Sequence, residues 1–99
     1  MLPFAGVIST RPYPPTGLTT ARWAAEVAPV EVAFADLWLT QERVVIPALW
    51  GQTDRASDAY PHVVRWQGTN YVEDGHNRIV RAALGAGVTS MPMRVFNVH

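Results

Sequence analysis

The sequence predicts a small α+β domain, in which a short mixed sheet with a hairpin is packed by two or three helices. Runs rich in β-branched and aromatic residues are separated by segments of helical composition, in the order strand, helix, hairpin, helix, strand. With 99 residues, of which 48% are hydrophobic, the chain has the size of one domain that buries a single core.

The N-terminal part is expected to be an arm followed by a short helix. Residues 1–18 contain four prolines, which favour extended backbone, and GVI at 6–8 has the composition of a short strand. Thr19 and Thr20 then precede the run ARWAAEVA. A threonine N-cap before good helix formers predicts a helix, and Pro29 ends it.

The middle of the chain begins with a strand and continues with less regular patterns. VEVAF at 30–34 alternates as a strand does, which places its two valines and its phenylalanine on one side. Thr40 is a candidate cap for a short helix from Gln41, which Pro47 would interrupt. Residues 51–61 are polar and rich in turn formers, so we expect a loop there.

The C-terminal half carries the clearest patterns. HVVRW at 62–66 and NYVED at 70–74 flank QGT, which predicts a β-hairpin with a glycine-containing turn. A helix is expected at 76–86, with a stop at Gly87 and a last strand in MPMRVFNV at 91–98. The alternation of this last strand is imperfect, with one side formed by Met93, Val95 and Asn97 and the other by Met91, Arg94 and Phe96.

The predicted helix is apolar over more than half of its circumference. Placing its residues every 100° gives an apolar stripe that two further residues widen: Ile79, Ala82, Ala83 and Ala86, with Val80 and Leu84. A helix of this kind is expected to be buried on most sides.

Composition excludes several classes of function. No cysteine is present, so disulfides, thiolate metal sites and thiol nucleophiles are excluded. The net charge is zero and the eight basic residues are scattered along the chain. Because DNA binding depends on a basic surface, we do not expect this chain to bind DNA without another domain. No apolar run approaches the ~20 residues that span a bilayer, so we expect a soluble, cytoplasmic protein. All bases are arginine, which suggests a GC-rich genome, such as an actinobacterium or its phage.

The most polar cluster lies where the second helix begins, at Asp74, Gly75, His76, Asn77 and Arg78. The first turn of a helix presents free backbone N–H groups and the positive end of the helix dipole, and an arginine fork suits phosphate or carboxylate. The residues themselves leave two readings open: an anion site, or a well-made turn in which an aspartate caps the helix. Ligand-like spacing for a metal is absent from the sequence.

This cluster, with its flanking strand, alanine-rich helix and final strand, resembles the box of the ParB/sulfiredoxin-like superfamily. The upstream run with Asp36, Leu37, Thr40, Gln41 and Val44 also resembles the segment before that box. The resemblance implies a ParB-like domain at 29–99, after a proline-rich arm and short helix at 1–28. It also implies a nucleotide- or phosphate-binding site. Sulfiredoxin activity is excluded, because a histidine stands where that family has its catalytic cysteine.

These observations lead to two candidate functions, and catalysis is left open in the first of them. The first is a small ParB-like domain whose Gly75, His76, Asn77 and Arg78 bind a phosphate or nucleotide. In it His76 and Asp74 would be the catalytic residues, and a nucleotide with Mg²⁺ is the candidate cofactor.

The alternative is a non-enzymatic interaction protein, such as a phage accessory protein that binds a host factor. It keeps the fold without the chemistry. Trp38 and Trp50 are its candidate interface residues, because tryptophan is enriched at binding hot spots.

Overall fold

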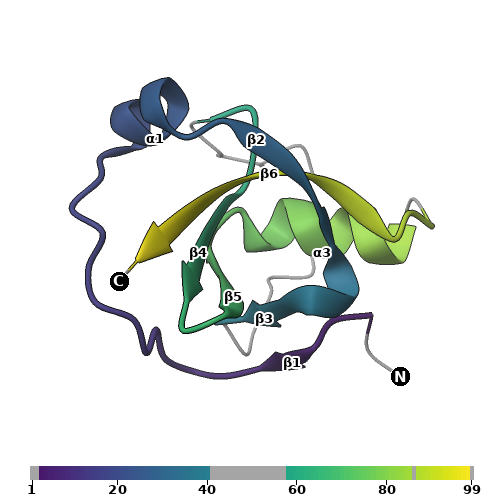
Figure 1. Cartoon of the computed structure of the whole chain (residues 1–99). Coiled ribbons are helices and arrows are strands. Elements are labelled where there is room, and N and C mark those ends of the chain that lie inside the picture. Colours follow the sequence, from purple (N-terminus) through teal and green to yellow (C-terminus); the bar gives the residue numbers. More distant parts are fainter. Residues whose placement is uncertain (1–2, 41–57, 86, 99) are drawn as a thin grey trace.

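The computed structural model describes residues 3–40, 58–85 and 87–98, which form a six-stranded mixed sheet and two α-helices (Figure 1). The elements in chain order are β1 (Gly6–Val7), α1 (Thr20–Glu26), β2 (Pro29–Ala33), the 3-10 helix η1 (Phe34–Asp36), β3 (Leu37–Leu39), β4 (His62–Trp66), β5 (Thr69–Asp74), α3 (His76–Gly85) and β6 (Ser90–Val98). The predicted small α+β architecture with a mixed sheet is confirmed at this level.

The sheet has the strand order β1-β3-β5-β4-β6-β2. Strands β1 and β3, β3 and β5, and β4 and β6 pair in parallel, whereas β4 with β5 and β2 with β6 are antiparallel. Although η1 alone separates β2 from β3 in the chain, the two strands lie in different parts of the sheet. The segment from β2 to β3 therefore curves round one side of the molecule (Figure 1).

The predicted hairpin is present as β4 and β5. Its two turn residues, Gln67 and Gly68, have φ angles of 51° and 78°. Positive φ at both central positions is the type I′ geometry, whose twist matches that of paired strands. Glutamine accepts this left-handed conformation less readily than glycine or asparagine.

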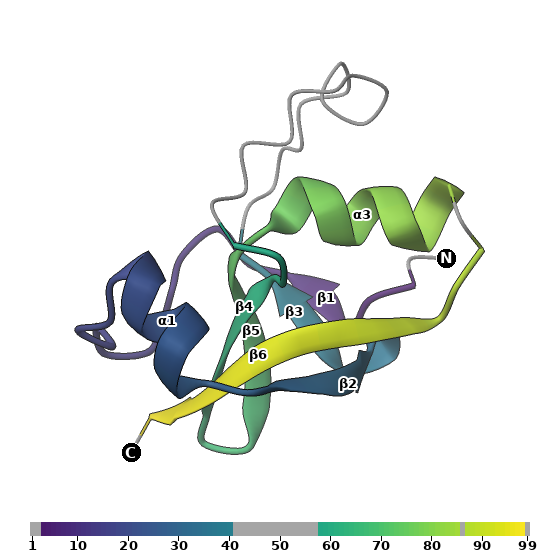
Figure 2. The ribbon, with the colours of Figure 1, turned by 90° about the horizontal axis from the view of Figure 1, so that it is seen from above.

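Helix α3 lies across one face of the sheet (Figure 2). Its Ile79 and Val80 join the larger core cluster with residues from β2, η1, β3, β4, β5 and β6: Val32, Phe34, Leu37, Leu39, Val63, Val72 and Met93. Leu84 is 66% exposed, so the buried stripe of α3 is narrower than the helical projection predicts. The reason is that the helix rests on the sheet along one side only.

The other face of the sheet is covered by the N-terminal segment, which runs round the outside from β1 to α1 (Figure 1). Tyr13 and Trp23 are buried there against Val64, together with the partly buried Tyr71 and Phe96. Helix α1 begins as predicted, because the Thr19 side chain accepts a hydrogen bond from Arg22 N at 3.2 Å.

Some expectations differ from the structure. Val30 is 50% exposed, because β2 is an edge strand of the sheet and none of the described elements covers that residue. The sequence pattern also missed β3, which has only three residues. The helix expected from Gln41 and the tryptophan at 50 lie outside the described residues. Within the described part of the chain, no helix is long and apolar enough to cross a membrane.

Candidate functional site

The polar cluster at residues 74–78 lies at the turn between β5 and α3. Gly75 has φ 94°, and a Cβ there would lie 3.0 Å from Cβ and 3.1 Å from Cα of Pro61. Both the backbone angle and the close contact favour glycine. Asp74 Oδ1 accepts a hydrogen bond from Gly75 N at 3.0 Å, and Ile79 N donates to Gly75 O at 3.0 Å. The junction is thus a tight strand-to-helix turn.

His76, the first residue of α3, is 4% exposed. Its Nε2 accepts a hydrogen bond from Thr40 N at 3.0 Å, and Thr40 Oγ1 lies 3.2 Å away while donating to Val72 O. A ring nitrogen that accepts a backbone N–H carries no proton, so the neutral ring is protonated on Nδ1. Burial, assisted by the charge of Arg11, lowers the pKa of His76 to about 4.

The remaining members of the cluster follow along the first turn of α3. Arg78 donates from Nη2 to the carbonyl oxygen of Asp58 at 2.8 Å, which ties the helix to the residue at the start of the described segment 58–85. Asn77 is half-buried. The structure thus keeps Asp74, Gly75, His76, Asn77 and Arg78 at one junction, and their catalytic and phosphate-binding roles stay predictions.

Beside this junction lies a buried polar network that the sequence did not reveal. The Asp58 carboxylate accepts hydrogen bonds from Arg94 Nε at 2.7 Å and from His62 Nε2 at 2.6 Å, both on Oδ2. Its Oδ1 accepts from Ala59 N at 2.7 Å and from Arg94 Nη2 at 3.3 Å. Arg94 also donates from Nη1 to Val27 O at 2.7 Å, which joins β6 to the end of α1.

The hydrogen bonds from Arg94 hold the pKa of the Asp58 carboxyl far below its usual range, although burial alone would raise it. The side chains of Asp58 and His62 are 7% and 3% exposed. Trp23 stacks on the His62 ring with centroids 4.4 Å apart, and the Arg94 guanidinium lies 5.0 Å from the Tyr60 ring centroid. The network therefore joins α1, β4 and β6 to Asp58.

One signal in the sequence could have indicated this network. Arg94 interrupts the apolar alternation of the last strand, and it is 9% exposed. A charge at a buried strand position requires a partner of opposite charge. The sequence does not say which acid supplies it, because Asp58 is 36 residues away.

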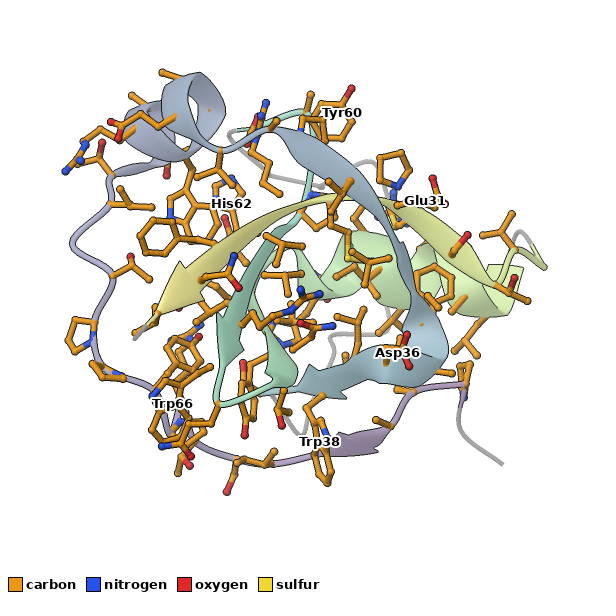
Figure 3. All side chains as sticks on the ribbon, in the orientation of Figure 1. Glu31, Asp36, Trp38, Tyr60, His62 and Trp66 are labelled. Carbon is orange, nitrogen blue, oxygen red and sulfur yellow. The ribbon has the colours of Figure 1, made fainter. Side chains whose placement is uncertain are left out.

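A second polar region lies at the other end of β5. An open groove of about 520 Å³ is lined by residues from four short segments: Ala5, Ala35, Asp36, Trp38, Arg65, Gly68, Thr69 and Asn70. Figure 3 shows Trp38 and Asp36 at this end of the molecule, with His62 toward α1. Over the five residue steps from Thr69 to Asp74, a strand rises about 17 Å, so the groove and the junction are separate surfaces.

Trp38 was a predicted interface residue, and the structure places it in this groove. Its side chain is half-buried and its ring lies over Gly6, where a Cβ would come within 2.5 Å of the ring. Because Leu37 and Leu39 point into the core with α3, Trp38 lies on the opposite side of β3. Its binding role stays a prediction.

The N-terminal segment encloses a smaller groove of about 380 Å³ next to β5. There the Tyr13 hydroxyl donates to Glu73 Oε1 at 2.5 Å, and Arg11 Nη2 donates to Glu73 O at 2.9 Å. Burial, assisted by the Glu73 carboxylate, raises the pKa of the Tyr13 hydroxyl. These contacts hold the segment on the sheet. Among the described residues, no group of three His, Cys, Asp or Glu is placed to hold a metal ion.

Comparison with protein families matches the chain, over residues 2–99, to a family described as Antitoxin VapB-like. This finding contradicts the resemblance to the ParB/sulfiredoxin-like superfamily, and with it the prediction of a ParB-like domain that binds a nucleotide. The box at Asp74–Arg78 was misleading because a glycine turn into a helix has the same short pattern in unrelated folds. The match gives no support to a phage accessory protein that binds a host factor. No curated protein and no solved structure matches the chain.

Proposed function

The chain belongs to the VapB-like antitoxin family, and from this premise we propose that it is the antitoxin of a toxin–antitoxin pair. It binds a toxin, which is a protein, and holds that toxin inactive. The observation that carries the proposal is the family match, which extends over residues 2–99 and so includes all the helices and strands that the structure describes.

The described structure is compatible with a partner that binds to a preformed surface. Both faces of the sheet are packed, one by α3 and the other by the N-terminal segment. The buried Asp58, His62 and Arg94 are satisfied by one another and by backbone groups. A scaffold fixed in this way loses little conformational entropy when it binds, which favours affinity.

The proposal is tested by rescue of growth. Open reading frames from the source genome are expressed singly in a bacterial host, and those that arrest growth are expressed again together with this chain. We expect the chain to relieve the arrest caused by one of them and to co-purify with its product, because neutralisation by an antitoxin requires a physical complex.

Two controls make the result specific. A non-cognate growth-inhibiting protein should not be relieved, and a frameshifted copy of the chain should not relieve the cognate one. If no arrest is relieved, or if relief occurs without a complex, the proposed function is wrong.

A further inference from the structure

We propose that the groove at the start of β5 is the surface that receives the toxin, and that its occupant is a polypeptide segment with an acidic side chain directed at Arg65. This inference rests on the proposed function and deepens it, since it names the surface and the chemistry of the bound segment.

Arg65 is a cation held in position at the surface. Its Nε donates to Asn70 Oδ1 at 2.8 Å, and Asn70 is 9% exposed, so the anchor of the guanidinium is itself buried. The terminal Nη1 and Nη2 atoms have no hydrogen-bond or ion-pair partner in the described ranges 3–40, 58–85 and 87–98. A guanidinium whose orientation is already fixed loses little freedom when a carboxylate binds to its free N–H groups.

The hairpin stiffens the wall of the groove that carries this arginine. Arg65 pairs with Asn70 across the two strands, and the tight turn at Gln67 and Gly68 lies immediately beyond them. Gln67 is held in the left-handed region, a conformation that persists in a non-glycine residue only where its surroundings enforce it. Asn70 is in β5, one residue pair away from this two-residue turn.

Trp38 supplies an apolar surface in the same groove. Its ring rests on Gly6, which lacks the Cβ that would collide with it. It remains half-buried and is thus in contact with both protein and solvent. Tryptophan and arginine are both enriched at binding hot spots, and both line this groove.

The composition of the groove favours a polypeptide over a nucleic acid. Asp36 lies in the groove with Arg65, and it makes no hydrogen bond or ion pair with any other described residue. A phosphate backbone would be repelled by this carboxylate, whereas a polypeptide can offer it a backbone N–H or a basic side chain next to the acidic one. The small Ala5, Ala35 and Gly68 leave room for a main chain to approach.

The β5–α3 junction is the competing surface, and three of its side chains already make hydrogen bonds inside the protein. His76 accepts from Thr40, and Arg78 donates to the Asp58 carbonyl. A segment bound there would have to replace contacts that already exist. The groove therefore offers the better surface for a partner.

The test uses the full chain and the toxin that it co-purifies with. Arg65→Glu is compared with Arg22→Glu, a charge reversal on α1. Helix α1 and strand β3, which carries Trp38 of the groove, lie at opposite sides of the molecule in Figure 1. By isothermal titration we expect Arg65→Glu to weaken toxin binding about tenfold or more, and Arg65→Gln to weaken it less. We expect Arg22→Glu to bind like the unmodified chain. Thermal unfolding of each variant identifies any loss of binding that is due to misfolding.

A photo-crosslinker gives a second readout that does not depend on weakened binding. p-Benzoylphenylalanine in place of Trp38 should crosslink to a toxin peptide that contains Asp or Glu, and the same group in place of Arg22 should not. Equal binding by Arg65→Glu and the unmodified chain would show that the groove does not receive the toxin, while leaving the proposed function intact. A crosslinked peptide without an acidic residue, or a DNA or RNA oligonucleotide whose binding depends on Arg65, would also overturn the inference about the groove. Failure of the unmodified chain to bind any toxin would remove both proposals.

Discussion

An aspartate lies near each end of β5, and the two differ in their burial and in their partners. Near the end that leads into α3, Asp58 is 7% exposed and is held by an arginine, a histidine and a backbone N–H. At the other end, Asp36 is exposed and lines an open groove with Arg65. The first aspartate stabilises the fold, and the second is available to a partner.

This difference shows that a polar cluster in the sequence does not by itself indicate polar groups that are free to bind a partner. The densest polar cluster, at Asp74–Arg78, is largely engaged in hydrogen bonds within the chain. The groove is built from ordinary residues that are distant in the sequence. What separates the two regions is whether the fold already supplies partners for their polar atoms. Four predictions test this comparison.

Asp58→Asn should have the largest effect. The substitution conserves shape but removes the charge that compensates Arg94, and so leaves a guanidinium with 9% exposure beside a neutral amide. Breaking a buried ion pair in this way costs about 3–5 kcal/mol in the free energy of unfolding. Chemical denaturation monitored by tryptophan fluorescence measures it. A loss below about 1 kcal/mol would mean that the network does not stabilise the fold.

The stability of the protein should fall as pH decreases from about 6.5 to 4. His76 has its pKa lowered from 6.5 to about 4 by burial, so the unfolded chain binds a proton in this range and the folded chain does not. Burial of the neutral His76 ring therefore costs no stability above about pH 6.5, whereas roughly 3 kcal/mol of the free energy of unfolding is lost by pH 4. Asp58 does not share this window, because its ordinary pKa of 3.8 is lowered further.

Denaturation curves at pH 7.5 and pH 4.5 measure this dependence. His76→Gln is the control, since its Oε1 atom can accept the hydrogen bond from Thr40 N without titrating. The variant should lose the part of the pH dependence that comes from His76. An unchanged pH profile in His76→Gln would show that another group is responsible.

Gly6→Ala should have an intermediate effect at the groove. The new Cβ would lie 2.5 Å from the Trp38 ring, so either the ring or strand β1 must move. Overpacking of this kind costs about 1–3 kcal/mol, and a half-buried ring that can swing outward places the effect near the lower limit. In a double-mutant cycle, Trp38→Ala should remove most of this cost. Additive effects of the two substitutions would contradict the contact.

Asp36→Asn should have the smallest effect on stability, although it is the same substitution as Asp58→Asn. The Asp36 side chain is exposed and makes no ion pair or hydrogen bond with the described residues. A surface change of this kind alters the free energy of unfolding by no more than about 0.5 kcal/mol. A larger loss, measured by the same denaturation experiment, would mean that Asp36 supports the fold.

The elements with strong local signals were predictable, and those that depend on distant partners were not. The Thr19 cap, the glycine-containing hairpin and the helix after Gly75 are each determined within a few residues, and each is present. Strand β3 was missed because three residues are too few to show a period. The helical projection overestimated how much of α3 is buried, because it contains no information about where the sheet ends.

Local sequence was enough to predict the α+β class, the position of both described helices and the tight turn at Gly75, because these follow from backbone preferences and from the period of apolar residues. Which polar groups are satisfied depends on the three-dimensional fold. It brought Asp58 to Arg94 across 36 residues and left Arg65 and Asp36 at the surface of a groove. The physical reason is that the satisfaction of a charge depends on atoms that come close only when the sheet forms, and local sequence does not specify them.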